Sequence, residues 1–370
     1  MSNLKYQICI FTTVHSPFDT RVFHKEAISL VKSGYDVILI APHTKDEIVD
    51  GIFIKAIHKP KSRLKRMTQG VWDVYQKAIH AQADIYHFHD PELIPIGLIL
   101  RIKGKKVIYD VHEYYKEKIK SKTYIPKLFR HLLAFSFDVF ETFVSRFFTA
   151  IIVTDTVTAK KFRTPTLCIS NYPSILETPF EERKKNDIFS VIYVGILSRN
   201  RGLFKMVEAI ELIQYPSQLL LIGDIKSKED ENIIEHLKNH DRAHLLGPKP
   251  WPEAMAITAS CHAGLAVFQP VPAYLYAGMN TVKLFEYMML ALPVIASDFQ
   301  NLSAIINRIH CGITVNPSDP KLIAQALEYL ILNPIEAAEM GRRGRLAVEK
   351  EFNWSTEENK LLDLYHQHLR

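Results

Sequence analysis

The strongest candidate for chemistry in the sequence is a glycine followed by two arginines. The apolar segment Ser190 to Gly195 has the composition of a buried strand, and helical spacing of apolar residues begins at Leu203. Arg199 and Arg201 lie in the turn between them. Such a turn directs backbone N–H groups and the positive end of a helix dipole to one place, and arginine binds phosphate oxygens through two N–H groups. The spacing predicts a phosphate site; two surface arginines are the alternative.

A second candidate is the segment from Asn280 to Asp298, which has the pattern of a helix followed by a buried strand. Asn280, Lys283 and Glu286 recur every third residue and therefore share one helix face. A lysine in the first turn is unfavourable unless an anion binds there. Glu286 lies in an otherwise apolar helix and needs a partner, which the two hydroxyls of a ribose would supply. The alternative is a surface ion pair between Lys283 and Glu286.

Imidazole and carboxylate side chains gather at two strand ends in the first half of the chain. His89 and Asp90 follow one expected strand, and His112 and Glu113 follow the next. Open α/β domains usually bind ligands at the carboxyl ends of their strands. These four residues are therefore predicted to contact substrate.

The same region could hold a metal, because His87 and His89 share one face of a strand. No third ligand follows at a typical spacing, and the sequence has no Asp-x-Asp triplet. We therefore expect no metal and no other cofactor. If the chemistry involves a sugar nucleotide, arginine, lysine and helix dipoles would stabilise the charge on its leaving group. Asp19 and Arg21, at the first strand-to-helix turn, form another anion-facing position or, alternatively, an ordinary helix cap.

Twelve short apolar segments rich in Ile, Val and Tyr alternate with helical patterns, which predicts an α/β protein with two doubly wound, Rossmann-like domains facing across a cleft. We expect an N-terminal domain over residues 1–172, a linker over 173–187 and a C-terminal domain over 188–354. Ser355 and Glu358 have capping-box spacing and predict a final helix over 355–370. The expected strands are Gln7–Val14, Asp36–Ala41, Ile52–Ile57, Ile85–His89, Lys106–Val111, Ala150–Thr154, Ser190–Gly195, Gln218–Ile222, Ala243–Leu246, Ala263–Phe268, Pro293–Ala296 and Gly312–Val315.

Composition supports a globular protein without export. Of the 370 residues, 47% are hydrophobic and 23% charged, which excludes disorder and a coiled coil. The four cysteines have no Cys-x-x-Cys spacing, and the N-terminus lacks the pattern of a signal peptide. The most hydrophobic segment, Leu128 to Val153, is interrupted by charged residues, so no transmembrane helix is predicted. We expect a cytoplasmic protein.

Charge is distributed unevenly between the two halves. Residues 1–185 carry 29 Lys plus Arg against 19 Asp plus Glu, a net charge of +10, and the rest carries 17 against 21, a net charge of −4. Aromatic residues between Leu128 and Phe147 lie beside the basic cluster Lys116 to Arg130. This combination suits either an anionic membrane surface, with peripheral attachment to its inner face, or solvated basic faces. No nucleic-acid-binding module accompanies the charge, so we expect no nucleic acid partner.

Together these pieces resemble the family 4 glycosyltransferases, a retaining group with the GT-B fold that includes many bacterial envelope polysaccharide enzymes. The resemblance covers nearly the whole chain. The motifs that carry it are Phe18-Asp-Thr-Arg-Val-Phe-His-Lys-Glu, His89-Asp-Pro-Glu-Leu, Tyr109-Asp-Val-His-Glu, Tyr193-Val-Gly-Ile-Leu-Ser-Arg-Asn-Arg-Gly, Lys283-Leu-Phe-Glu-Tyr-Met, Leu292-Pro-Val-Ile-Ala-Ser-Asp and Phe352-Asn-Trp.

The resemblance implies a role for each matching residue. Arg201 matches the basic residue that binds the donor diphosphate, Glu286 the glutamate that holds the donor ribose, and His112 a histidine near the donor sugar. The family's final helix crosses back to the first domain. Two positions depart from the family pattern: Ile196 replaces an arginine, and Gly278 replaces the first glutamate of a pair. Arg199 and Lys283 are expected to supply the missing charge.

The implied function is transfer of a hexose from a UDP- or GDP-sugar to a hydroxyl of a lipid-linked or oligosaccharide acceptor, with retention and without metal. The residues expected to take part in catalysis are His112, Arg199, Arg201 and Lys283. Those expected to bind substrate are Asp19, Arg21, His89, Asp90, Glu113, Gly195, Asn280 and Glu286. Two alternatives stay open: a nucleotide-sugar epimerase of the same double fold, and an inactive nucleotide-binding or scaffold protein.

Overall fold

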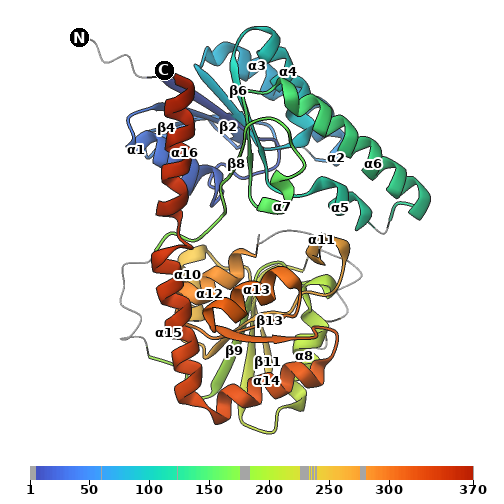
Figure 1. The fold of residues 1–370 in the computed structure, drawn as a ribbon, viewed down its shortest axis with the longest axis vertical. Helices are drawn as coiled ribbons and strands as arrows, with labels where there is room; N and C mark the ends of the chain where they lie inside the picture. Colours follow the sequence, from blue (N-terminus) through green and yellow to red (C-terminus); the bar gives the residue numbers. More distant parts are fainter. Residues whose placement is uncertain are drawn as a thin grey trace. The chain divides into compact units, whose positions relative to one another are not determined.

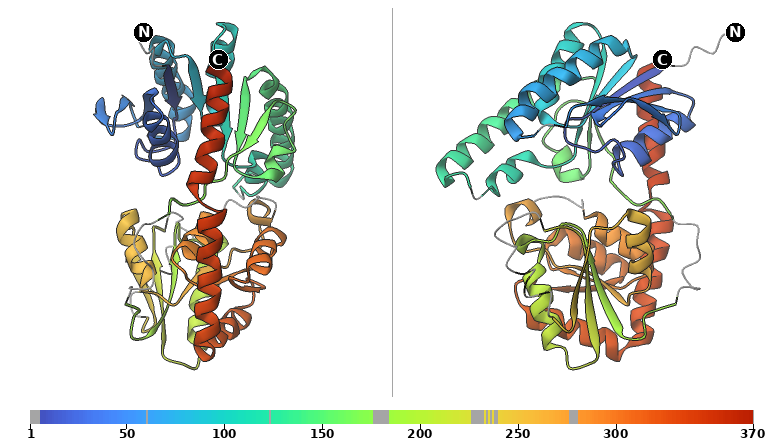
Figure 2. Two further views of the ribbon diagram at one scale, coloured as in Figure 1. Left: turned by 60° about the vertical axis from the view of Figure 1, so that its left-hand side comes forward. Right: turned by 180° about the vertical axis from the view of Figure 1, so that it is seen from behind.

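The computed structural model describes residues 6–59, 61–122, 124–175, 184–225, 233, 235, 237, 240–275 and 281–369. The chain divides into two compact units. The first consists of Met1–Asn171 together with Trp354–Arg370, and the second of Tyr172–Asn353. Each unit is a sheet covered by helices on both faces (Figures 1 and 2), so the prediction of two doubly wound α/β domains is confirmed.

The first unit contains an eight-stranded sheet in the order β3-β4-β2-β1-β5-β6-β7-β8, in which only the β3–β4 pair is antiparallel. Side chains of β1 alternate between two buried layers: Cys9 and Phe11 face one layer, Ile8 and Ile10 the other. The strands are β1 (Gln7–Phe11), β2 (Asp36–Pro42), β3 (Glu47–Val49), β4 (Ile52–Ile57), β5 (Ile85–Phe88), β6 (Lys106–Val111), β7 (Ala150–Val153) and β8 (Thr166–Cys168).

Helices of the first unit follow the strands and cover the sheet. The long helix α6 (Lys127–Val144) is the exception, because only Ala134, Glu141 and Val144 of its residues are buried. The other helical segments are η1 (Val22–Ala27), α1 (Ile28–Lys32), α2 (Arg63–Lys65), η2 (Arg66–Gly70), α3 (Val71–Ala81), η3 (Pro91–Leu93), α4 (Ile94–Ile102), α5 (Tyr115–Lys120), η4 (Ser145–Phe147) and α7 (Thr156–Ala159).

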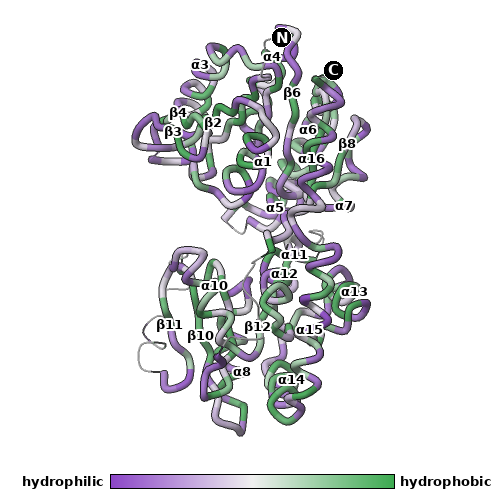
Figure 3. Tube along the Cα trace, turned by 90° about the vertical axis from the view of Figure 1, so that its left-hand side faces the viewer, coloured by the Kyte–Doolittle hydropathy of each residue, from purple (hydrophilic) through white to green (hydrophobic). Residues whose placement is uncertain are grey.

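The second unit has a six-stranded, wholly parallel sheet in the order β11-β10-β9-β12-β13-β14. Its strands are hydrophobic along their length, as β10 and β12 show in Figure 3, because both faces are buried. The elements are β9 (Phe189–Val194), η5 (Arg199–Arg201), α8 (Leu203–Leu212), β10 (Ser217–Ile222), β11 (Ala243–Gly247), α10 (Trp251–Ala259), β12 (Ala263–Ala266), α11 (Pro272–Leu275), α12 (Val282–Met289), β13 (Val294–Ser297), α13 (Gln300–Ile309), β14 (Gly312–Val315), α14 (Pro320–Leu332) and α15 (Pro334–Lys350).

The last helix, α16 (Trp354–Leu369), packs against η1 and α1 of the first unit (Figure 1). The indole Nε1 of Trp354 donates to Ser29 Oγ at 3.0 Å, and the Tyr365 hydroxyl lies 2.8 Å from His87 Nδ1. The prediction that Ser355 caps this helix is wrong, because the helix already begins at Trp354, whose buried side chain anchors the first turn.

All twelve expected strands are present, with ends displaced by at most three residues. Strands β3 and β8, each of only three residues, were not predicted. Such short segments carry too little periodicity to be separated from loops.

Candidate functional site

In the second unit, a glycine at the end of β9 brings two cations together. Gly195 has φ of 146°, a conformation that side chains disfavour. A Cβ placed on it would lie 3.4 Å from Nη1 of Arg201 and 3.5 Å from Cε of Lys283. The turn after β9 and the first turn of α12 therefore direct two positive groups to the same place.

A second glycine fixes the start of the helix that follows. Gly202 has φ of 84°, and a Cβ there would lie only 2.2 Å from the carbonyl oxygen of Val267. Only glycine permits this approach, which holds η5 and Arg201 against the strand region. The partly buried guanidinium of Arg201 contacts the hydroxyls of Tyr193 and Tyr274, which raise its pKa although burial opposes this.

The carboxylate of Glu286 lies beside this pair of cations and is 3% exposed. Its Oε1 accepts a hydrogen bond from the Trp251 indole at 2.9 Å, and its Oε2 accepts one from Lys283 Nζ at 2.8 Å. The alternative of an ion pair between Lys283 and Glu286 is thus realised, but the carboxylate is buried and not on the surface. A ribose would have to share it with Trp251 and Lys283.

Two other predicted residues of this unit are less tightly placed. Arg199 is exposed, and its Cζ lies 4.2 Å from the centroid of the Phe204 ring. Asn280 lies outside the described residues, as does Gly278. Their predicted contacts with the donor stay predictions.

In the first unit, the predicted residues surround a buried carboxylate that the sequence analysis did not single out. Asp110, at the end of β6, is fully buried. Its Oδ2 accepts a hydrogen bond from Nη2 of Arg21 at 2.9 Å. Nε of Arg21 lies 2.8 Å from Oε1 of Glu26, and Nη1 donates to the carbonyl of Ile169. Because Arg21 is 2% exposed and has these internal partners, the structure favours a structural role over contact with substrate.

Three histidines extend this network towards the surface. Nδ1 of His89 lies 2.9 Å from Nε2 of His112, which is 3.4 Å from Oδ2 of Asp110. The ring of His15 lies 4.9 Å from that of His112, centroid to centroid. The His89 side chain is fully buried and that of His112 is 15% exposed, so His112 is the member of this pair that solvent reaches.

Burial and neighbouring charges shift the pKa values of the groups in this network in different directions. Burial lowers the pKa of His89 to about 4 despite the opposing hydrogen bond with Asp110, and it raises the pKa of Glu26 well above its ordinary value. Burial would also raise the pKa of Asp110, but the charge of Arg21 together with the contacts from His112 and His89 outweighs it and holds this pKa well below the usual range. At neutral pH, His89 is therefore uncharged, and Asp110 is the anion that balances Arg21.

The remaining predicted residues have local partners. Oδ1 of Asp19 accepts hydrogen bonds from the backbone N–H groups of Arg21 and Val22 at 2.8 and 3.0 Å, which agrees with the helix-capping alternative. Oδ2 of Asp90 accepts from the hydroxyl of Thr12 and the backbone of Thr13, both at 2.7 Å, and so ties β5 to the end of β1. Glu113 is exposed and paired with Lys118.

A metal ion would find one cluster of ligands among the described residues. Glu26, His87, His89 and Asp110 are buried and offer ligand atoms within 4.8 Å of one another. The guanidinium of Arg21 already contacts both carboxylates. A divalent cation would have to lie next to this fixed positive charge, so we interpret the four side chains as partners of the Arg21 guanidinium and not as metal ligands. That the chemistry needs no metal stays a prediction.

Several residues that complete the two sites were not predicted from the sequence: Asp110 and Glu26 in the network, His15 beside His112, and Trp251 against Glu286. His15 follows the first strand within a few residues, so its position at a strand end was a usable signal. No local pattern marks Trp251, whose partner lies 35 residues away.

Comparisons with known proteins agree with this architecture. Residues 19–165 match the family model "Glycosyltransferase Family 4", and residues 174–347 match "Glycosyl transferases group 1". Among curated proteins, the chain is 24% identical to D-rhamnosyltransferase WbpZ of Pseudomonas aeruginosa over 288 residues, which is 75% of this chain and 71% of that protein. It is also 28% identical to the putative teichuronic acid biosynthesis glycosyltransferase TuaC of Bacillus subtilis, over 43% of this chain and 38% of that protein.

Solved structures of glycosyltransferases superpose along almost the whole chain. Sucrose-phosphate synthase from Thermosynechococcus elongatus has a TM-score of 0.77 at 18% identity, with 98% of this chain and 99% of that chain covered. HepE from Anabaena in complex with UDP-glucose has a TM-score of 0.71 at 14% identity, with 98% and 99% covered. At these identities the likeness shows the fold, and the predicted GT-B fold is confirmed. The matches taken together support a GT-B glycosyltransferase.

Proposed function

We propose that this chain, whose two halves match glycosyltransferase families, transfers a hexose from a nucleoside diphosphate sugar to a hydroxyl of a lipid-linked or oligosaccharide acceptor in polysaccharide synthesis. The observation that carries the proposal is the convergence of Arg201 and Lys283 at Gly195. This point follows the carboxyl end of β9, a central strand of the second sheet, where open α/β domains bind ligands.

The geometry suits a diphosphate leaving group. Cleavage of the bond between sugar and phosphate leaves negative charge on the diphosphate, and the cations of Arg201 and Lys283 are held in place before that charge develops. Arg201 is fixed by two tyrosine hydroxyls, and Lys283 by its ion pair with Glu286. Oxygens of Glu286 next to the same cations would accept hydrogen bonds from the ribose hydroxyls.

The finer features of the reaction are part of the proposal. His112, the solvent-reached member of its pair with His89, is placed near the donor sugar by the family resemblance. No carboxylate nucleophile is assigned. We therefore propose retention by front-face attack, in which the departing phosphate accepts the acceptor proton and no metal takes part. HepE, whose fold is similar, has been solved in complex with UDP and with UDP-glucose, which favours a UDP-sugar as the first donor to test.

Nucleotide binding and sugar transfer should be tested in one set of variants. In the wild-type protein, UDP or GDP at 100 times its dissociation constant should stabilise the fold by about 2.7 kcal/mol. Arg201→Ala and Lys283→Ala should each weaken nucleotide binding and lower the rate of transfer about 10²- to 10³-fold. Lys321→Ala, at an exposed position of the same unit, is the matched control.

The outcomes separate the competing functions. Retained transfer in both variants would refute the assignment of the site. Product formed from the donor alone, without acceptor, would indicate an epimerase. Nucleotide binding without transfer or donor hydrolysis would indicate an inactive binding protein.

A further inference from the structure

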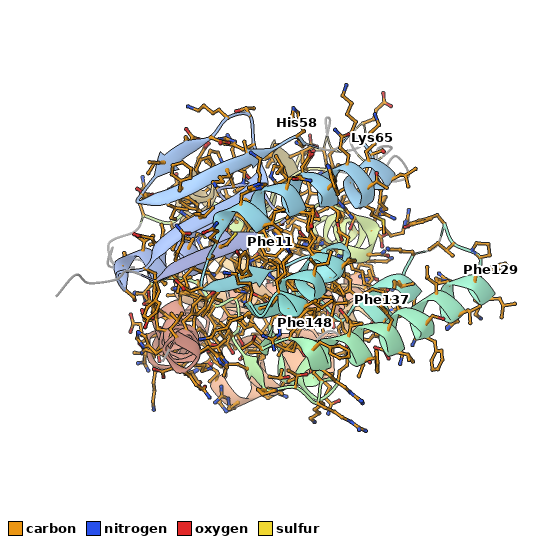
Figure 4. All side chains as sticks on the ribbon, turned by 90° about the horizontal axis from the view of Figure 1, so that it is seen from above. Phe11, His58, Lys65, Phe129, Phe137 and Phe148 are labelled. Atoms are coloured by element: carbon orange, nitrogen blue, oxygen red, sulfur yellow. The ribbon has the colours of Figure 1, made fainter. Side chains whose placement is uncertain are left out.

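The outer face of α6 is the most unusual surface of the first unit. Eight large apolar side chains of this helix are between 46% and 80% exposed. They are Leu128, Phe129, Leu132, Leu133, Phe135, Val139, Phe140 and Phe143. Figure 4 shows Phe129 at the outer end of the helix. Soluble monomers rarely expose so large a contiguous apolar patch, so this face requires a partner.

The eight side chains lie on one side of the helix. At 3.6 residues per turn, their positions fall within a single arc of about 160°. The buried Ala134 and Glu141 lie on the opposite side, where α6 packs on the unit. Phe137, at the edge of that side, makes an edge-on contact with Tyr115 of α5, with ring centroids 5.9 Å apart. The helix is thus amphipathic with its apolar side outward.

Basic residues flank the apolar face at both ends. Lys127 and His131 are exposed at the N-terminal end, and Arg146 is exposed just after the C-terminal end. The two acidic residues of the helix are each paired with a lysine: Asp138 is 3.0 Å from Lys116, and Glu141, which is buried, contacts Lys161. The exposed charge around the apolar face is therefore positive.

Segment 63–67 extends the same character next to the N-terminal end of α6. Arg63 donates a hydrogen bond to the Tyr124 hydroxyl, which places this segment beside the loop before α6. Leu64 and Met67 are 74% and 54% exposed, and Lys65 is exposed between them. Segment 63–67 therefore adds exposed apolar and basic side chains next to the N-terminal end of α6.

We propose that the face formed by α6, with segment 63–67, docks the protein onto an anionic lipid bilayer. Helix α6 would lie parallel to the membrane, with its apolar arc at the acyl boundary and the flanking cations among the headgroups. None of the described helices is long and apolar enough to cross a bilayer, which fits surface binding. The proposal specifies the peripheral membrane partner and rests on this surface alone, not on the chemistry proposed for the second unit.

The basic residues at both ends of the α6 face favour an anionic bilayer over a second copy of the chain as its partner. Both ends of the apolar face are basic, so two copies packed face to face would bring like charges together whether the helices ran parallel or antiparallel. An anionic surface instead complements both ends at once. Each Lys or Arg near such a surface contributes about 1 kcal/mol, which corresponds to roughly a fivefold change in binding.

Vesicle flotation of the 370-residue chain tests the proposal. Vesicles of phosphatidylcholine with 30% phosphatidylglycerol should carry the protein, and vesicles of phosphatidylcholine alone should carry much less. Leu132→Gln/Phe135→Gln should lower binding to the anionic vesicles at least tenfold, because both side chains leave the acyl boundary. Lys127→Gln/Arg146→Gln should lower binding to the anionic vesicles about 25-fold at low salt. Both pairs are exposed, so thermal unfolding should be unchanged.

Matched controls come from the second unit. Leu332→Gln/Ile335→Gln removes two apolar side chains that are 59% and 83% exposed, and it should leave vesicle binding unchanged. Equal binding of wild type and the Leu132/Phe135 variant would overturn the proposal, as would absence of binding to anionic vesicles. Sedimentation that shows a dimer dissolved by the same variant, without vesicle binding, would assign the face to a second copy. The nucleotide-induced thermal shift reports separately on the proposed activity.

Discussion

Replacing Gly195 by alanine tests whether the cations of the second unit bind one ligand. The new methyl group would lie 3.4 Å from Nη1 of Arg201, 3.5 Å from Cε of Lys283 and 3.2 Å from the hydroxyl of Tyr193. A phosphate bridging both cations must occupy the same space. The variant leaves both charges in the protein, so a loss of binding would report on the shape of the site and not on its net charge.

The size of the effect follows from the number of contacts disturbed. A hydrogen bond to a charged group contributes about 1.5–3 kcal/mol, so the loss of one such contact should raise the dissociation constant for UDP by up to about 100-fold. At 100 times the wild-type constant, nucleotide stabilises wild type by about 2.7 kcal/mol and the variant by about 0.4 kcal/mol. For a domain of 150–250 residues this corresponds to thermal shifts of about 5–11 °C and about 1–2 °C, respectively.

The assay compares melting with and without UDP for three proteins. Gly195 and the control position Gly247 both have positive φ, so alanine at either position strains the backbone and lowers the melting temperature of the free protein. Gly247→Ala is the matched control, since φ there is 70° and nothing lies within 4 Å of the added methyl. It should keep the wild-type nucleotide shift. A wild-type shift in Gly195→Ala would refute the inference that Arg201 and Lys283 share a ligand.

Three further predictions concern the supporting interactions. Trp251→Phe removes the indole hydrogen bond to the buried carboxylate of α12 and should lower the free energy of unfolding in urea by about 1.5–3 kcal/mol, whereas Trp72→Phe, at a side chain 58% exposed, should change it by less than about 0.5 kcal/mol. Asp110→Asn leaves Arg21 without its anion and should cost about 3–5 kcal/mol in the same assay; unchanged stability would exclude the buried pair as a structural element. The pKa of His89 is about 4 in the folded protein against 6.5 ordinarily, so the unfolded chain binds the proton first as the pH falls. Its contribution of about 3 kcal/mol should be complete above pH 6.5 and lost towards pH 4, and urea midpoints of His89→Asn should vary less with pH over that interval.

Local patterns in the sequence were sufficient for the elements and for part of the second site. The strand before Gly195, the arginines after it and the spacing of Lys283 and Glu286 are all defined within a few residues, and the structure brings Gly195, Arg201, Lys283 and Glu286 together. Trp251 completes the site from 35 positions away, and no spacing rule connects it to α12.

The first unit was harder to predict because its contacts are distant in sequence. Arg21 lies at a strand-to-helix turn, and the sequence alone suggested an anion-facing position or, alternatively, an ordinary helix cap. The anion is instead Asp110, 89 residues away and fully buried. Local spacing cannot distinguish a charge that waits for a ligand from one that is already neutralised inside the fold, because the difference lies in burial.

The same difference in burial separates the Arg21–Asp110 network of the first unit from the Arg201, Lys283 and Glu286 site of the second unit. In the first unit, Asp110 balances the charge of Arg21, and the carboxyl group of Glu26 contacts the same guanidinium, so this cation has its partners inside the fold. In the second unit, Lys283 pairs with the carboxylate of Glu286, whereas the guanidinium of Arg201 contacts two tyrosine hydroxyls at a turn that solvent reaches. A diphosphate therefore gains more from the second unit. The part of the first network that can meet a substrate is its rim, at His112 and His15.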